Sequence, residues 1–316
     1  MKNKNILVTG GAGLIGSHLC EYLIKAGNKV TCVDNFITGK KENIKALQGD
    51  LRFSFIEADV ATQALTYLPK QSLFDEIYHL ASPAAPKAYQ LNPVATYLVN
   101  GIGTHYLLEY ARQSKSRFLF ASTSEVYGDP KVHPQKEEYW GNVNPLGSRA
   151  CYDESKRFGE MVSMTFWRKF QVDVRIARIF NTYGPRNDRD DGRVVPNFIQ
   201  QAIGNEPLTV YGDGSQTRSF CFVADLVDGL VKLMESDKTS GEVVNLGNPD
   251  EFTIGDFANL VIKIASSRST IEFEALPEDD PKQRKPDISK AMRLLNWQPV
   301  HSIEQGLIKT IEYFRS

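Results

Sequence analysis

Residues 5–23, NILVTGGAGLIGSHLCEYL, decide the fold that we expect for this 316-residue chain. A short apolar strand over 5–9 leads into Gly10, Gly13 and Gly16, and a helix follows over 14–23. Glycines at such positions let the backbone turn tightly and let a pyrophosphate approach the helix without meeting a Cβ atom. The free N–H groups and the positive end of the helix dipole then favour phosphate. The stretch therefore predicts a phosphate-binding turn between a strand and a helix.

The next strand, expected over 29–34, ends at Asp34. A carboxylate in this place accepts hydrogen bonds from an adenosine ribose, and it repels a 2′-phosphate, which favours NAD over NADP. The alternative is an ordinary strand–helix–strand unit with a tight turn and no nucleotide.

Strand-like and helix-like segments continue to alternate as far as about residue 180. We expect further strands at 51–57, 76–81, 117–121 and 172–178, and the clearest helices at 94–112 and 153–170. This alternation predicts an α/β fold with a Rossmann-like, doubly wound parallel sheet. We expect residues 1–180 to form the NAD-binding domain. Residues 181–316, with an acidic loop at 277–281, would form a smaller mixed lobe that interleaves with it around the active site.

The composition narrows the classes of partner. A net charge of −1 gives no electrostatic reason to expect nucleic acid or an acidic membrane surface, and no apolar run is long enough to span a membrane. The first strand begins too early to leave room for a signal peptide. The four cysteines and five histidines show no metal-ligand spacing, so we expect no metal, reduced thiols and a cytoplasmic protein.

Tyr152 and Lys156 lie four residues apart at the start of an expected helix, and therefore on one face of it. A nearby lysine cation stabilises a phenolate and lowers the pKa of the tyrosine. Tyr152 can then take the proton of a substrate hydroxyl as hydride leaves its carbon, with Thr123 or Ser124 hydrogen-bonded to the same oxygen. The alternative is a packing tyrosine with a surface lysine.

Further motifs indicate a family. They are HLASP at 79–83, STSEVYGDP at 122–130, CYDE at 151–154, NTYGP at 181–185 and RKPDI at 284–288. With them the chain resembles the extended short-chain dehydrogenases/reductases that act on nucleotide sugars, over nearly its whole length. Within that family it is similar to the UDP-glucuronate decarboxylases, or UDP-xylose synthases. The resemblance also implies a homodimer formed through the helices at 94–112 and 153–170.

The resemblance implies a redox-neutral reaction. NAD⁺ takes hydride from C4 of UDP-glucuronate while Tyr152 takes the hydroxyl proton, the resulting 4-keto acid loses CO₂, and the hydride returns to give UDP-xylose. Sugar-nucleotide 4,6-dehydratases carry an aspartate where this chain has Ser124, so the acid for loss of water is missing here. Glu125 would orient a water, help to manage the proton at C5, or only cap the backbone. A 4,6-dehydratase, a 4-epimerase and a silent NAD-binding sensor are the alternatives.

The same resemblance assigns Arg284 to the carboxylate of the substrate, because a guanidinium can hold a carboxylate bidentately. Without the family match, a solvated arginine in a basic loop would be the simpler interpretation. Pro196, Ala85 and Lys87 depart from the pattern of the subgroup on the substrate side.

The remaining expectations concern binding residues. For the cofactor we expect Gly10, Gly13, Leu14, Ile15, Gly16, Asp34, Asn35, Phe36, Thr38, Gly39, Asp59, Val60, Leu80, Ala81, Ser82, Asn100, Tyr152, Lys156, Tyr183 and Arg186. For the substrate we expect Pro83, Tyr89, Asn181, Arg193, Val195, Asn197, Tyr211, Gln216, Arg218 and Arg284.

Overall fold

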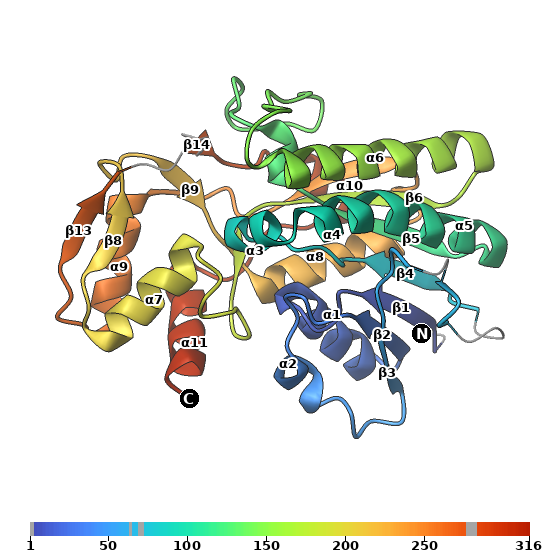
Figure 1. Ribbon diagram of the computed structural model, residues 1–316, viewed down its shortest axis with the longest axis horizontal. Helices are drawn as coiled ribbons and strands as arrows, with labels where there is room; N and C mark the ends of the chain where they lie inside the picture. The colour runs from blue at the N-terminus through green and yellow to red at the C-terminus, as the bar shows by residue number, and fades with distance from the viewer. Residues whose placement is uncertain (1–2, 63–64, 69–72, 276–282) are drawn as a thin grey trace.

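A seven-stranded, wholly parallel sheet carries the larger part of the chain (Figure 1). A computed structural model describes residues 3–62, 65–68, 73–275 and 283–316, so the acidic loop at 277–281 lies outside the described residues. The strand order is β3-β2-β1-β4-β5-β6-β11. The strands are β1 (Asn5–Thr9), β2 (Lys29–Asp34), β3 (Phe53–Glu57), β4 (Glu76–His79), β5 (Arg117–Thr123), β6 (Val174–Ile179) and β11 (Glu242–Leu246).

Helices cover both faces of this sheet. On one face lie α1 (Leu14–Lys25) and α8 (Val223–Glu235), and on the other α5 (Thr104–Ser114) and α6 (Ala150–Phe170) (Figure 1). Alternate side chains of β1 enter the two cores, since Ile6 and Val8 pack with α1 while Leu7 packs with the layer of α5. A strand buried on both faces must be apolar at every position, which explains the unbroken run ILV.

The expected parallel sheet is confirmed, and each strand predicted up to residue 180 is present within a few residues of its expected bounds. The helix predicted at 94–112 forms as α4 (Pro93–Leu98), a π-helical turn (Val99–Gly103) and α5. The sequence reasoning missed β11, which pairs with β6 from beyond residue 180. We keep the division at residue 180 as a proposal, with β11 and α8 as the interleaved part.

The second lobe consists of shorter elements beside the carboxyl ends of the strands (Figure 1). Its helices are α7 (Val194–Gly204), α9 (Ile254–Ala265) and α11 (Ile303–Arg315). Its strands include β8 (Leu208–Tyr211), β9 (Thr217–Ser219), β12 (Glu251–Thr253), β13 (Ile271–Glu274) and β14 (Gln283–Arg284). β14 pairs with β9, which sets Arg284 beside Arg218.

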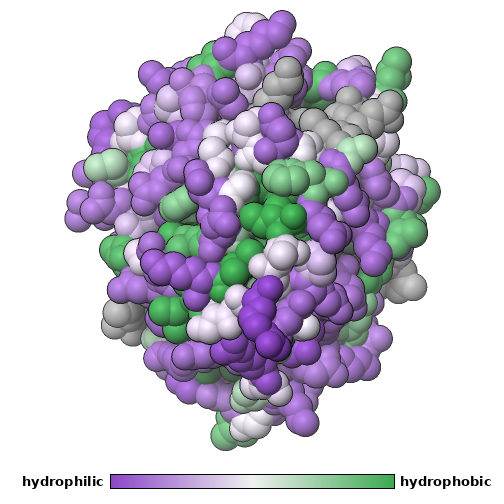
Figure 2. Space-filling model, turned by 90° about the vertical axis from the view of Figure 1, so that its left-hand side faces the viewer, coloured by the Kyte–Doolittle hydropathy of each residue, from purple (hydrophilic) through white to green (hydrophobic). Residues whose placement is uncertain are grey.

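Short elements complete the description. They are α2 (Lys41–Lys45), α3 (Pro86–Leu91), the 3₁₀ turn Ser124–Tyr127, β7 (Thr182–Tyr183), β10 (Cys221–Phe222) and α10 (Ser289–Leu295). Figure 2 shows the end of the molecule formed by the second lobe, where hydrophilic side chains cover most of the surface and hydrophobic ones gather near its middle. Among the described residues, none of the helices combines the length and apolar character that crossing a bilayer would require.

Candidate active site

A cavity of about 750 Å³ opens at the carboxyl ends of the strands, lined by residues of both lobes. This is the edge at which open parallel sheets bind ligands. The site residues predicted from the sequence line this cavity, with the exception of Phe36, Gly39, Asn100 and Tyr183.

The glycine turn forms the cavity wall after β1. Gly10 has a φ of 72°, and a Cβ atom there would lie 2.6 Å from the backbone nitrogen of Ala81. A Cβ atom on Gly16 would lie 2.1 Å from the carbonyl oxygen of Gly10. Gly13 is the N-cap of α1 and has no capping side chain, so the first N–H groups of that helix have no partner from a cap. The backbone alone shapes this wall, and larger residues would fill it.

Asp34 ends β2 beside this turn and is buried. Its Oδ2 accepts the backbone N–H of Ala12 at 2.9 Å, and its Oδ1 accepts that of Phe36 at 2.8 Å. Burial raises the pKa of Asp34, against the effect of these backbone donors. Each carboxylate oxygen keeps a further lone pair, so Asp34 can still accept a hydrogen bond from a hydroxyl group.

Tyr152 and Lys156 lie on one buried face of α6. The Lys156 Nζ donates to the carbonyl oxygen of Ala121 at 2.8 Å and lies 5.7 Å from the centre of the Tyr152 ring. Lys156 is only 4% exposed, so the alternative of a surface lysine is wrong. Tyr152 is hydrogen-bonded to the hydroxyl of Thr123, at the end of β5.

The expectation that Lys156 lowers the pKa of Tyr152 is not met in this structure. Burial raises the pKa of Tyr152, and the charge of Glu125 adds to the rise, while the hydrogen bond from Thr123 opposes it. Burial also lowers the pKa of Lys156 to about 7. Tyr152 is charged when it loses its proton and Lys156 is charged when it keeps it. Burial in the same low-dielectric pocket therefore favours the neutral form of both side chains.

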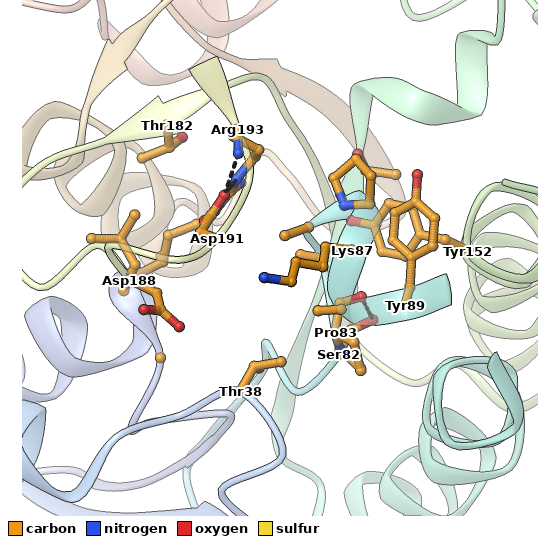
Figure 3. Close-up of a pocket in the computed structure, with 18 of the residues that line it drawn as sticks. Thr38, Ser82, Pro83, Lys87, Tyr89, Tyr152, Thr182, Asp188, Asp191 and Arg193 are labelled. Carbon is orange, nitrogen blue, oxygen red and sulfur yellow. Dashed lines mark hydrogen bonds and ion pairs between the residues drawn. The ribbon is translucent and has the colours of Figure 1, made fainter. Parts of the chain in front are cut away.

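Tyr89 of α3 stacks on Tyr152, with ring centres 5.0 Å apart and planes 4° from parallel. Figure 3 shows the two rings side by side at the cavity wall, above Ser82 and Pro83. The Tyr89 hydroxyl is buried and has no hydrogen-bond partner among the described residues. The stack fixes the plane of the Tyr152 ring.

A second cluster gathers around Glu125, at the end of β5. Arg149 donates to its Oε2 at 2.6 Å, and Arg284 donates to the same oxygen at 3.3 Å. Burial alone would raise the pKa of Glu125, but the charges of Arg284, Arg149 and Arg218 outweigh it and hold the pKa below its usual value. Glu125 is therefore a carboxylate at neutral pH and an acceptor rather than an acid.

Arg284 is 1% exposed, so the alternative of a solvated loop arginine is wrong. Besides Glu125, its guanidinium donates to the carbonyl oxygens of Ser124 and Gly128. It lines the cavity from behind Ser124 and Glu125, with much of its donor capacity already used. Asp153 lies near this cluster, and burial together with the charge of Glu125 raises its pKa to about 7.

Polar residues of the second lobe form the opposite wall. Arg193 is paired with Asp191, as the dashed line in Figure 3 marks. Arg218 donates to the carbonyl oxygen of Thr217 at 2.8 Å, and Gln216 to that of Tyr211 at 2.5 Å. These contacts hold the side chains of Arg193, Arg218 and Gln216 in position, so that this wall presents hydrogen-bond donors.

The four residues outside the lining support the wall instead. Phe36 packs on Phe55, and Gly39 has no room for a side chain because a Cβ would lie 2.7 Å from the Asp34 carboxylate. Asn100 donates to the hydroxyls of Ser82 and Ser155. Tyr183 is turned away, and its hydroxyl donates to the carbonyl oxygen of Ile303.

Sequence reasoning missed Arg149, which donates to Glu125 at a shorter distance than Arg284 does. Arg149 is the N-cap residue of α6, where the positive end of the helix dipole disfavours a cation. An arginine at a helix N-terminus therefore indicates that a carboxylate lies near it, and this could have pointed to the pair of Arg149 and Glu125.

The observed geometry fits a dinucleotide. A pyrophosphate requires space beside the glycine turn, which a Cβ atom would fill, and N–H donors such as those at the start of α1. The ribose requires an acceptor such as the buried Asp34. Together with the tyrosine–lysine pair they define an NAD-dependent enzyme of the extended short-chain dehydrogenase/reductase class.

Comparison with known proteins gives the family. A model of the NAD dependent epimerase/dehydratase family matches residues 6–247, and the chain belongs to that family. UDP-glucuronic acid decarboxylase 1 of Danio rerio is 53% identical over 98% of this chain and 72% of its own length. UDP-glucuronic acid decarboxylase 1 of Arabidopsis thaliana is 53% identical over 100% of this chain and 71% of its own length.

A solved structure adds a likeness in three dimensions. UDP-glucuronic acid 4-epimerase from Bacillus cereus, in complex with UDP-glucuronic acid and NAD, is 34% identical and has a TM-score of 0.88. The match covers 98% of this chain and 99% of that one.

Proposed function

We propose that this chain is an NAD-dependent UDP-glucuronate decarboxylase that forms UDP-xylose and CO₂ through a UDP-4-keto sugar. The sequence identity to proteins of that name over the whole chain supports it. The observation that carries the proposal is the pair Ser124 and Glu125 at the cavity wall, with Arg284 buried behind them.

The glycine turn and Asp34 would hold NAD, which when bound accepts hydride from C4 of the sugar and later returns it. Burial keeps Tyr152 protonated in the chain without ligand, and the positive charge of oxidised NAD bound near it would favour the phenolate. Tyr152 would then take the proton of the C4 hydroxyl at its phenolic oxygen, with the Thr123 hydroxyl hydrogen-bonded to it. Lys156 would add positive charge near the ring in its protonated form, which a phenolate at Tyr152 would in turn favour, and Tyr89 would keep the ring in its plane.

The next step breaks the C5–C6 bond. CO₂ leaves, and the electron pair of that bond moves into the neighbouring C4 ketone as an enolate, which the hydroxyls of Tyr152 and Thr123 stabilise by hydrogen bonds. C5 then gains a proton from solvent, and Tyr152 would give its proton back to the C4 oxygen as the hydride returns. Because the arginines keep Glu125 ionised and position 124 is a serine, neither of these two residues is a carboxylic acid that could protonate a leaving hydroxyl. This favours decarboxylation over 4,6-dehydration.

For the nucleotide we propose contacts from the second lobe. Arg193 and Arg218 would approach the diphosphate, and Asn181 and Gln216 would supply neutral donors. Tyr211 on β8 lies at the uracil end in this arrangement, at the opposite wall from Tyr152.

Incubation of the chain with UDP-glucuronate and NAD⁺, followed by mass spectrometry, tests the function. Formation of UDP-xylose with equimolar CO₂ is the expected result. Formation of UDP-galacturonate would make the chain a 4-epimerase, and release of water from a UDP-hexose would make it a dehydratase. NAD binding without turnover of any of these would favour a sensor.

We also propose a homodimer and a cytoplasmic location. Apolar side chains stand exposed along the π-helical turn, α4 and α6, among them Tyr97, Ile102, Phe158 and Met161. Such a row favours burial against a second copy. The four cysteines are free, as in proteins of reducing compartments. Sedimentation of the purified chain tests the dimer.

A further inference from the structure

A charged loop over residues 185–192, which we call the strap, joins β7 to α7. Most of its residues line the cavity, and so do the glycine turn and the segment that follows β2. Figure 3 shows Asp188 of the strap on one side of the open space and Ser82 and Pro83 on the other, with Thr38 below them. A dinucleotide bound at the glycine turn would therefore lie between that turn and the strap.

The first residues of the strap are fixed to α1, the helix that begins at the glycine turn. His18 is hydrogen-bonded to the carbonyl oxygen of Pro185 at 2.9 Å. Arg186 forms an ion pair with Glu21, one turn further along the helix. These contacts join the strap to the lobe that is expected to hold NAD.

The later residues of the strap are fixed to the second lobe. Arg189 donates to the carbonyl oxygen of Phe314 on α11 at 2.7 Å. Asn187 donates to the buried Asp191 at 3.0 Å, and Asp191 in turn pairs with Arg193 at the start of α7. The strap is thus attached to both lobes and spans the boundary between them beside the cavity.

The middle of the strap meets the segment after β2 through an ion pair. The Nζ of Lys40, the residue before α2, lies 2.6 Å from Oδ1 of Asp188, and both residues line the cavity. The side chains are 45% and 36% exposed, so the pair can break without disturbing the core. A carboxylate beside a pyrophosphate site repels the ligand, which indicates that Asp188 has a role other than binding it.

We propose that Lys40 and Asp188 form a latch, which holds the strap closed over bound NAD and slows release of the cofactor. Both are positioning residues, because they act on the strap. The inference goes beyond the proposed reaction, since it concerns how long NAD stays bound and not the fate of the sugar. A reaction that returns its hydride in every turnover has no need to exchange the cofactor.

Stopped-flow fluorescence tests the latch by following the release of NADH from the loaded chain into excess NAD⁺, with no sugar nucleotide present. Lys40→Met and Asp188→Asn should each speed release about threefold at low salt, as loss of an exposed ion pair allows. The double variant should be no faster than the faster single variant, because the two changes remove one interaction. In about 1 M salt the difference from the wild type should disappear, since salt screens an exposed pair.

A second pair of variants separates the latch from a change of net charge. The exchanged pair, Lys40→Asp together with Asp188→Lys, should restore most of the slow release. Lys232→Met and Asp228→Asn are the matched controls, since these residues form an ion pair of similar exposure on α8 and do not line the cavity. Both controls should release NADH at the rate of the wild type.

The direction of the Asp188→Asn effect decides between a latch and a direct contact. Slower release by Asp188→Asn with faster release by Lys40→Met would show that each charge acts on the cofactor phosphates, and would overturn the latch. Additive effects in the double variant would overturn it too, because the residues would then act independently. Unchanged release in both single variants would show that the pair does not hold the strap.

Discussion

The two walls of the cavity are built in different ways. The cofactor wall comes from consecutive segments, β1, α1 and β2, and its shape depends on backbone groups and on the absence of side chains at Gly10 and Gly16. The substrate wall brings Glu125, Arg149 and Arg284 together from three distant elements and depends on paired charges. We therefore expect the cofactor wall, which is formed by neighbouring segments of the chain, to be sensitive to larger side chains at its glycines. We expect the substrate wall, which is formed by distant segments, to be sensitive to removal of a charged side chain.

The sharpest test of this difference is Tyr152→Phe. Loss of the phenolic oxygen removes the proposed proton acceptor, and turnover of UDP-glucuronate should fall about a thousandfold. NAD should stay bound, because the cofactor wall is untouched. Tyr313→Phe, a change of the same atom at an exposed helical position, should leave turnover unchanged. Full turnover by Tyr152→Phe would refute the base role.

Arg284→Ala tests the charge of the substrate wall. The change leaves Glu125 with fewer partners and two carbonyl oxygens without their donor, so stability should fall by about 3 kcal/mol. Turnover should fall as well, while the folded fraction keeps its NAD affinity. Urea unfolding and assays at low temperature measure the two effects, with Arg268→Ala, at an exposed position, as control. Unaltered stability would contradict the buried pairing.

Gly16→Ala tests the cofactor wall in the same manner. The added methyl would lie 2.1 Å from the carbonyl oxygen of Gly10, so the turn must open and its N–H groups must move. NAD affinity should fall roughly a hundredfold, equivalent to about 2.7 kcal/mol. Gly49→Ala is the control, since a Cβ there meets nothing within 4 Å. Equal NAD affinity in Gly16→Ala and Gly49→Ala would show that the turn accommodates a methyl group without losing NAD binding, and would contradict the prediction.

The smallest expected effect concerns pH. Lys156 has a pKa near 7 in the folded chain and near 10.4 when unfolded, so between these values the unfolded state binds more protons. Stability from this group must then rise with pH, by about 2 kcal/mol between pH 7 and 9. The difference in unfolding free energy between wild type and Lys156→Met, measured without NAD at both pH values, isolates the effect. A difference independent of pH would contradict the buried, depressed lysine.

The sequence predicted the cofactor wall nearly residue by residue because each of its parts is local. Glycine spacing, the strand before it and Asp34 after it all lie within one strand–helix–strand unit. Prediction failed where side-chain direction depends on distant packing. Tyr183 follows a recognisable motif, yet its ring turns towards Ile303 because the second lobe offers its hydroxyl an acceptor there. Lys156 lies one helical turn from Tyr152, and the sequence predicted that its charge lowers the pKa of the tyrosine. Burial instead raises the pKa of Tyr152 and lowers that of Lys156.

By itself, the sequence determined the parallel sheet and the glycine turn, and it singled out the side chains that we propose to react, because periodicity and short spacings act within a few residues. Only the tertiary structure decided that β11 completes the sheet, that Arg149 and Arg284 share one carboxylate, and that Lys40 meets Asp188 at the cavity. These outcomes depend on contacts between separate elements, 24 residues apart for Arg149 and Glu125 and 159 residues apart for Arg284 and Glu125, and such contacts are set by packing.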